Sequence, residues 1–289
     1  MVKHKNRKKT QIISYLIIAA LVFVFLYPFW QTFVISISGR AYVESPGFKF
    51  WPRDIGLSAY EQIFSSDSIF IGYANTIWRT VVGTAITLTI TFCAAYAMTH
   101  KELPGWSAIN FIIVFTMFFG GGLIPAYLNL KSLGLLNTRW VLVLPGAAGA
   151  WNCIIMRNFL SGISKEMEEA ARIDGASAMQ TMLRIYLPLS KAVIAVVGLW
   201  SVVGHWNAWY DSLVYANKDN LLVVQTVVRR LLVEADEAAA SGDMVTMADS
   251  TAETVRCATI MVATLPILAG YPFIQKYLVK GTMVGAVKG

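Results

Sequence analysis

The segment EEAARIDGASAMQTMLRIYLPLS, residues 168–190, is a charged, helix-forming passage between two long hydrophobic runs. Its pattern predicts two short helices joined by a tight corner. Ser164 is expected to cap the first helix, whose opening turns hold three glutamates where the helix dipole favours anions. That helix should end at Asp174 and Gly175, because glycine adopts the left-handed conformation that closes many helices.

The second helix is predicted to restart directly after the corner. Ser177 and Gln180 have the S-x-x-Q spacing of a capping box, and the helix should continue to Leu187, where Pro188 ends or kinks it. Spacings of three and four give it one apolar face, made of Met179, Met182, Leu183 and Tyr186. Helices that rest on lipid headgroups usually carry Lys and Arg. This hairpin opens with glutamates instead, so we expect a protein partner.

The composition of the chain is that of a polytopic membrane protein. Of its 289 residues, 56% are hydrophobic and only 14% are charged, against about 25% charged in soluble domains. Mean hydropathy is +0.56, and the apolar runs reach the roughly 20 residues that cross a bilayer. We assign the net charge of +7 to basic loops facing an anionic membrane surface. No basic, aromatic-rich soluble domain predicts binding of nucleic acid.

Six apolar runs predict six transmembrane helices and an all-α fold. They cover residues 11–38, 74–98, 108–130, 140–160, 191–216 and 256–279. The small-residue stretches FFGGGLIP (118–125) and PGAAGAW (145–151) are expected to allow helices to approach closely.

Charge predicts the orientation of these spans. The basic tail 1–10 holds five Lys and Arg residues, which places the N-terminus in the cytoplasm. Six spans then place the tail 280–289 in the cytoplasm as well. Between the two tails, the chain is predicted to form a first transmembrane helix at 11–38, an external loop at 39–73 and a five-helix core at 74–279. The hairpin lies in the cytoplasmic loop 161–190 of that core.

The hairpin resembles the EAA loop of binding-protein-dependent ABC importer permeases. The matching residues are Glu169-Ala170-Ala171, Gly175 after three more, Ile185 after nine more, and Leu187-Pro188 after one more. From about residue 70 the chain is similar to the carbohydrate-uptake branch, whose maltose-type partner permease ends in a similar VKG. The ending YPFIQKYLVKGTMVGAVKG (271–289) resembles the subset that serves oligosaccharides and polysaccharide fragments.

The resemblance implies a type I ABC importer permease fold in a bacterial inner membrane, with the loop as a coupling helix that docks into a cytoplasmic ATPase. It implies a charged contact from Glu169, a small contact face at Ala170 and Ala171, and a tight corner at Asp174 and Gly175. It also implies that three further residues connect the second helix to the fifth span, namely Ile185, Leu187 and Pro188.

The implied partners are a second, homologous permease subunit, two ATPase subunits, an extracytoplasmic solute-binding protein and membrane lipid. ATP and Mg would be bound by the ATPases and not by this chain, which lacks the G-x-x-x-x-G-K-[ST] sequence of a P-loop. We expect no catalytic site, no metal site and no bound cofactor in this subunit. The expected cargo is an oligosaccharide, with an acidic fragment such as alginate as one option.

Polar and aromatic residues in two spans are candidates for the cargo pathway, because polar side chains inside a membrane usually face the bundle interior. These candidates are Asn152, Trp206, Asn207, Trp209 and Tyr210. The alternative for them is an interfacial aromatic belt with helix–helix hydrogen bonds. Arg79 is expected to extend to the outer surface in preference to lining the path.

The segment 217–255 is predicted to be external and helical. It either reaches the solute-binding protein, with Arg229 and Arg230 contributing, or folds as a lid over its own spans. Two other classes of function have sequence signatures of their own. An enzyme would need a motif such as H-E-x-x-H or G-x-S-x-G, which the sequence lacks. An ion-coupled secondary transporter, the main alternative, would usually show inverted repeats and midplane carboxylates.

Overall fold

The computed structural model describes residues 3–241 and 251–286, and in these ranges every regular element is a helix. The chain divides into two compact units. Unit 1 comprises residues 1–69 and 228–267, and unit 2 comprises residues 70–227 and 268–289. Parts of three predicted segments lie outside the described residues: 1–2 of the N-terminal tail, 242–250 of the external segment and 287–289 of the C-terminal tail.

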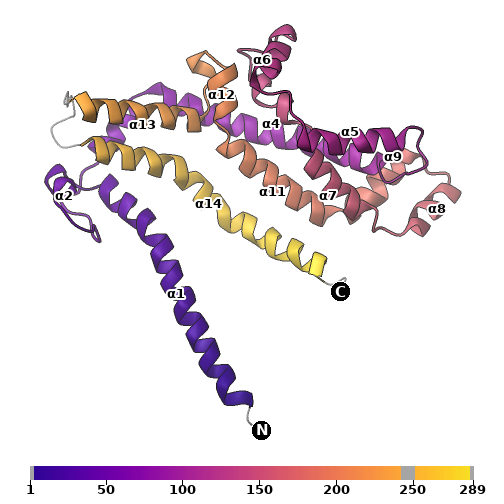
Figure 1. Cartoon of the computed structure of the whole chain (residues 1–289), viewed down its shortest axis with the longest axis horizontal. Coiled ribbons are helices and arrows are strands. Elements are labelled where there is room, and N and C mark those ends of the chain that lie inside the picture. Colours follow the sequence, from indigo (N-terminus) through magenta and orange to yellow (C-terminus); the bar gives the residue numbers. More distant parts are fainter. Residues whose placement is uncertain (1–2, 242–250, 287–289) are drawn as a thin grey trace. The chain divides into compact units, whose positions relative to one another are not determined.

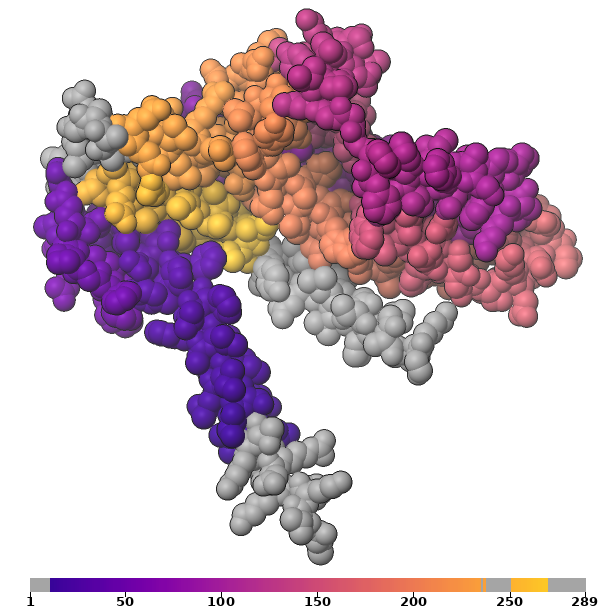
Figure 2. Space-filling view, in the orientation of Figure 1, coloured from indigo at the N-terminus to yellow at the C-terminus, as the bar shows by residue number. Residues whose placement is uncertain are grey.

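Unit 1 begins with α1 (Lys3–Ser36), a single long helix. Its apolar stretch Gln11–Ser36 is 26 residues long, and none of its most apolar window is buried. One face of this stretch is drawn in indigo in Figure 2. A helix that is apolar all round is stable where lipid or another subunit covers it. Because α1 starts at Lys3, the predicted N-terminal tail is helical from that residue onward.

The predicted external loop 39–73 is partly helical, with α2 (Arg40–Glu44) and α3 (Ser58–Phe64). Lys49 fixes the turn between them. Its side chain is buried, and its Nζ donates to the carbonyl oxygens of Tyr42 (2.5 Å) and Ser45 (2.6 Å). The ammonium also lies 4.4 Å from the centre of the Tyr42 ring, which gives a cation–π contact.

Two further helices complete the described part of the chain's second half, α13 (Val224–Ser241) and α14 (Ala252–Ala286). The prediction of helix in the external segment is therefore confirmed at α13. An ion pair between Asp236 on α13 and Arg256 on α14 links the two helices within unit 1. Because α14 continues to Ala286, residues 280–286 of the predicted C-terminal tail extend the last helix.

Unit 2 has its core where three helices lie side by side: α4 (Asp67–Ala97), α7 (Ala150–Leu160) and α11 (Lys191–Asn207), as Figure 1 shows. The buried core residues are Phe92, Ala95, Tyr96, Cys153, Met156, Leu160, Met182, Tyr186, Val193 and Val197. A loop with the short helix η4 (Asp219–Leu221) is fastened to α4, because Asn75 Nδ2 donates to the carbonyl oxygens of residues 220 (2.9 Å) and 222 (3.0 Å).

Glycine breaks one predicted span into α5 (Trp106–Phe118) and α6 (Leu123–Ser132), which are bent by 120°. Gly122 has φ +83°, a conformation that favours glycine. A Cβ added at Gly120 or Gly122 would meet nothing within 4 Å. Among the described residues these glycines turn the backbone, and the expectation that FFGGGLIP allows helices to approach closely stays a prediction.

Two more predicted spans are interrupted. The run 140–160 forms η1 (Arg139–Leu142), η2 (Leu144–Gly146) and α7, with a bend of 51°. The run 191–216 forms α11 and α12 (Tyr210–Tyr215). In the part of the chain that the structure describes, three helices are long and apolar enough to cross a membrane, or up to six if each of three bent pairs counts as one span. Six spans remain a prediction.

Candidate functional site

The hairpin 161–190 forms at one end of unit 2, where Figure 1 shows α8 beyond the ends of the core helices. In α8 (Lys165–Ile173), the Ser164 hydroxyl accepts the backbone N–H of Glu166 at 3.2 Å. The helix ends at Asp174, and Gly175 follows with φ +81°. The predicted cap and the left-handed corner are both present.

The second helix begins with the predicted capping box. In α9 (Ala178–Thr181), the Ser177 hydroxyl accepts the N–H of Gln180 (3.3 Å), and the Gln180 side chain accepts the N–H of Ser177 (2.8 Å). The chain continues through the π-helical turn η3 (Met182–Tyr186) into α10 (Leu187–Leu189).

The predicted kink at Pro188 is displaced. Pro188 lies inside α10, and the bend of 80° falls between Leu189 and Lys191. In an α-helix a proline ring clashes with the carbonyl four residues earlier. The wider π turn, in which the Leu187 N–H bonds to the Met182 carbonyl five residues back, removes Pro188 from a regular i→i−4 ladder.

The same π turn divides the predicted apolar face in two. Met182 and Tyr186 are buried in the core of unit 2. Met179 and Leu183 are 59% and 48% exposed. Ile173 at the corner is 86% exposed, so the hairpin offers apolar side chains as well as charge to its surroundings.

The predicted coupling residues lie mainly on the outside of the hairpin. Glu169, Ala170, Asp174, Gly175, Leu187 and Pro188 are exposed, and Ala171 is half-buried. Ile185 packs against the unit 2 core, so it connects the second helix to the span bundle. Six of the eight residues are thus available to another protein.

Glu168, one of the three glutamates predicted to stabilise the opening turns of this helix, turns inward. Its Oε1 accepts from His100 Nε2 and its Oε2 accepts from the Tyr186 hydroxyl, both at 2.8 Å. Burial by itself raises the pKa of Glu168. The hydrogen bonds from His100 and Tyr186, with the charges of His100 and Arg172, outweigh burial and hold the pKa below its ordinary value.

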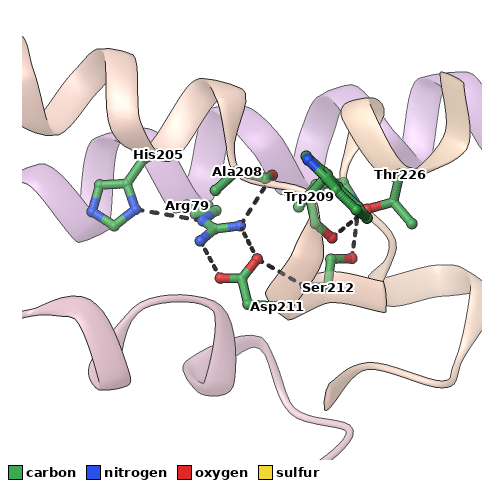
Figure 3. Close-up of polar contacts among 8 residues, drawn as sticks. Arg79, His205, Ala208, Trp209, Asp211, Ser212 and Thr226 are labelled. Carbon is green, nitrogen blue, oxygen red and sulfur yellow. Dashed lines mark hydrogen bonds and ion pairs between the residues drawn. The ribbon is translucent and has the colours of Figure 1, made fainter. Parts of the chain in front are cut away.

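A second polar cluster lies where α11 gives way to α12 (Figure 3). Arg79, on α4, donates from Nη1 to Asp211 Oδ1 at 2.9 Å and from Nη2 to Asp211 Oδ2. It also contacts the Ala208 carbonyl and His205 Nδ1, each at 3.4 Å. Only 5% of the Arg79 side chain is exposed. The expectation that Arg79 extends to the outer surface is wrong, because Asp211 and the open helix end satisfy its guanidinium internally.

Four of the predicted pathway residues gather at this break. Asn207 ends α11, Trp209 precedes α12 and Tyr210 begins it. The rings of Trp209 and Tyr210 meet edge to face at 5.5 Å, and the Trp209 carbonyl accepts the Thr226 hydroxyl at 3.0 Å, as Figure 3 shows. Trp206 is half-buried and Tyr210 is half-exposed.

The other predicted site residues lie elsewhere. Asn152 is half-buried on α7, one of the core helices of unit 2. Arg229 and Arg230 are exposed on α13, in the part of that helix that belongs to unit 1.

Residues 10–210 match the family described as binding-protein-dependent transport system inner membrane component. Protein LplC of Bacillus subtilis (strain 168) is 40% identical over 262 residues, which cover 91% of this chain and 89% of that protein. The polygalacturonan/rhamnogalacturonan transport system permease protein YtcP of the same organism is 37% identical, over 99% of this chain and 100% of that protein.

A solved structure has the same fold. It is the crystal structure of a bacterial ABC transporter involved in the import of the acidic polysaccharide alginate. One chain of that structure matches with a TM-score of 0.86 and 32% sequence identity, over 96% of this chain and 99% of that one.

Proposed function

The chain belongs to the family of binding-protein-dependent transport system inner membrane components, and from this premise we propose how it works as the permease subunit of an ABC importer for an oligosaccharide. The observation that carries the mechanism is the hairpin 161–190, capped at both helix starts, turned at Gly175 and exposed along Glu169 and Ala170. The alternative of an ion-coupled secondary transporter receives no support from the relatives.

The hairpin is the coupling loop in this proposal. It docks on a cytoplasmic ATPase subunit through Glu169, Ala170, Ala171 and the corner at Asp174 and Gly175. The exposed Ile173 supplies apolar contact area, for which a protein groove is a better environment than water. ATP and Mg are bound by two partner ATPase subunits, whose movement is passed to α11 through the second helix of the hairpin.

The cargo passes the break between α11 and α12. Trp206, Asn207, Trp209 and Tyr210 supply aromatic faces and hydrogen-bonding groups of the kind that hold sugars, and interrupted helices in transporters commonly surround the substrate site. An acidic oligosaccharide is the favoured class, because the names of YtcP and of the solved importer refer to polygalacturonan/rhamnogalacturonan and to alginate.

The assembly contains a second, homologous permease, two ATPases and an extracytoplasmic solute-binding protein. Both termini of the chain face the cytoplasm, and six spans cross the inner membrane. Arg229 and Arg230 on α13 face the solute-binding protein in this arrangement.

Native mass spectrometry of the gently extracted complex tests the assembly. We expect one copy of this chain with one other permease and two ATPase copies. The chain alone, or paired only with itself, would contradict the proposal. A solute-binding protein that stays bound can be released, and its sugar identified.

Two variants test the coupling loop in the complete importer reconstituted in lipid vesicles. Glu169→Lys reverses the charge that faces the ATPase, and Gly175→Pro cannot adopt a positive φ. Both should assemble in the membrane but hydrolyse ATP without uptake. Normal uptake by both would remove the coupling role from this hairpin.

A further inference from the structure

We propose that His100 is a positioning residue of the importer: it holds Glu168, so that α8 moves together with the cytoplasmic end of α4. This inference rests on the proposed role of the hairpin 161–190 in coupling. It adds a contact from outside the hairpin, through which the movement of α8 reaches a membrane span other than α11.

The position of α8 depends on polar contacts. None of its residues is fully buried, so hydrophobic packing contributes little to holding this helix. The side chain of Glu168 is largely enclosed, since only 16% of it is exposed. Through it, α8 is joined to His100, just beyond the end of α4, and to Tyr186 at the end of η3.

The residues that hold Glu168 are themselves held rigidly. The Tyr96 ring on α4 meets the His100 ring at 5.0 Å and the Tyr186 ring at 4.9 Å, in both cases edge to face. Tyr96 and Tyr186 are buried in the core of unit 2. A displacement of Glu168 is therefore passed to side chains that cannot rotate freely.

His100 has an acceptor on each side. Its Nε2 faces the Glu168 carboxylate, and its Nδ1 lies 3.2 Å from the Tyr96 carbonyl and 3.1 Å from the Thr99 hydroxyl. The Thr99 hydroxyl already donates to the Tyr96 carbonyl at 2.7 Å, so it has no hydrogen left for Nδ1. The His100 ring is therefore held between two acceptors, the Tyr96 carbonyl beside Nδ1 and the Glu168 carboxylate beside Nε2.

A cavity of about 340 Å³ opens beside His100 and Glu168. The charged residues that line it determine which variants are informative. Lys101, Lys165 and Arg172 line it together with Glu168. Arg172 Nη2 already lies 3.7 Å from Glu168 Oε1, and Lys101 or Lys165 can approach Glu168 once His100 is removed. Variants at both ends of the contact are therefore needed, and their effects are compared in a double-mutant cycle.

The experiment uses the complete importer in lipid vesicles and measures ATP hydrolysed per cargo molecule imported. We expect His100→Ala and Glu168→Ala each to raise this ratio about fivefold, the lower end of typical coupling between distant sites. The double variant should be no worse than either single one, because both remove the same contact. His100→Gln, which keeps a neutral donor near the Nε2 position, should recover most of the coupling.

The control is Glu166→Ala, which removes an exposed glutamate from the same helix and should leave the ratio unchanged. Equal assembly of all variants, checked by native mass spectrometry, separates this effect from misfolding. Unchanged ratios in His100→Ala and Glu168→Ala, or additive effects in the double variant, would overturn the inference. If Glu169→Lys uncouples transport while His100→Ala does not, only this inference fails. If neither uncouples, the coupling loop itself is wrongly assigned.

Discussion

The guanidinium of Arg79 donates to both carboxylate oxygens of Asp211, although 132 positions separate the two residues in the sequence. The pair fastens α4 to the first turn of α12, directly after the break that ends α11. A bidentate contact of this kind fixes orientation as well as distance.

Asp211→Ala should destabilise unit 2 by about 3 kcal/mol, because it leaves the guanidinium of Arg79 buried without its partner. Equilibrium denaturation of the purified subunit in detergent measures the loss. The double variant Arg79→Met/Asp211→Leu removes both charges and should be more stable than Asp211→Ala alone. A single variant as stable as the wild type would show that water, and not Asp211, satisfies the arginine.

Gly83 allows His205 to lie against α4. A Cβ at this position would be 2.5 Å from His205 Nε2 and 2.6 Å from its Cε1, closer than atoms can pack. Gly83→Ala should therefore displace the imidazole from Arg79 and cost about 1–3 kcal/mol, measured by the same denaturation assay. His205→Ala makes the space that the added methyl needs. We expect Gly83→Ala/His205→Ala to be about as stable as His205→Ala alone, and a further loss in the double variant would contradict the contact.

The corner of the hairpin requires a positive φ and has no need of a small side chain. Gly175 has φ +81°, and a Cβ there would meet nothing within 4 Å. Gly175→Val should cost about 1–2 kcal/mol through backbone strain alone, and uptake should fall. Gly175→Asn should retain most of the uptake, since asparagine adopts this conformation more readily. Equal losses in Asn and Val variants would mean that the partner surface, and not the backbone, demands glycine.

The contact of Glu168 with His100 and Tyr186 gives the hairpin a pH dependence with a definite sign. The pKa of Glu168 is lower in the folded protein than its ordinary value of 4.5. The ionised carboxylate therefore stabilises the fold at pH values above 4.5, and this contribution is lost as the pH falls through the lowered pKa. Hydrogen exchange of α8 amides in the wild type, followed from pH 7 to below pH 4.5 and corrected for the intrinsic pH dependence of exchange, should show more frequent opening of α8 below pH 4.5 than at pH 7.

Glu168→Gln provides the comparison, because it keeps the shape of the side chain but cannot ionise. Its α8 amides should already exchange faster at pH 7, and the difference from the wild type should shrink towards acid pH. A constant difference across this range would mean that the carboxylate charge does not hold α8.

The local design of the hairpin could be predicted from the sequence because it depends on near neighbours. The Ser164 cap, the Ser177–Gln180 box and the Gly175 corner each involve residues within a few positions of one another. The family assignment made from the spacing of Glu169, Gly175 and Pro188 is confirmed by the match over residues 10–210.

What the sequence did not reveal are contacts between distant elements. His100 and Glu168 are 68 positions apart, and no motif marks the histidine. Arg79 lies in an apolar run, and its long side chain is expected to extend to the outer surface. Its partner, Asp211, lies on a different helix and far away in the sequence. Hydropathy also does not predict the breaks after Phe118 and Asn207, because it reports the length of an apolar run and not whether the helix is continuous along it.

The π turn at Met182–Tyr186 has a consequence for the history of the gene. Such a turn holds about one residue more than an α turn, so it is a place where a single codon can be lost while the helix survives. Because the wider turn accommodates that residue, its loss would restore an α turn and leave the hairpin with nearly the same orientation about the helix axis. Among homologous genes, the loss of one codon should therefore be tolerated within these five codons more often than in the regular helices, where it would rotate the preceding part by about 100°.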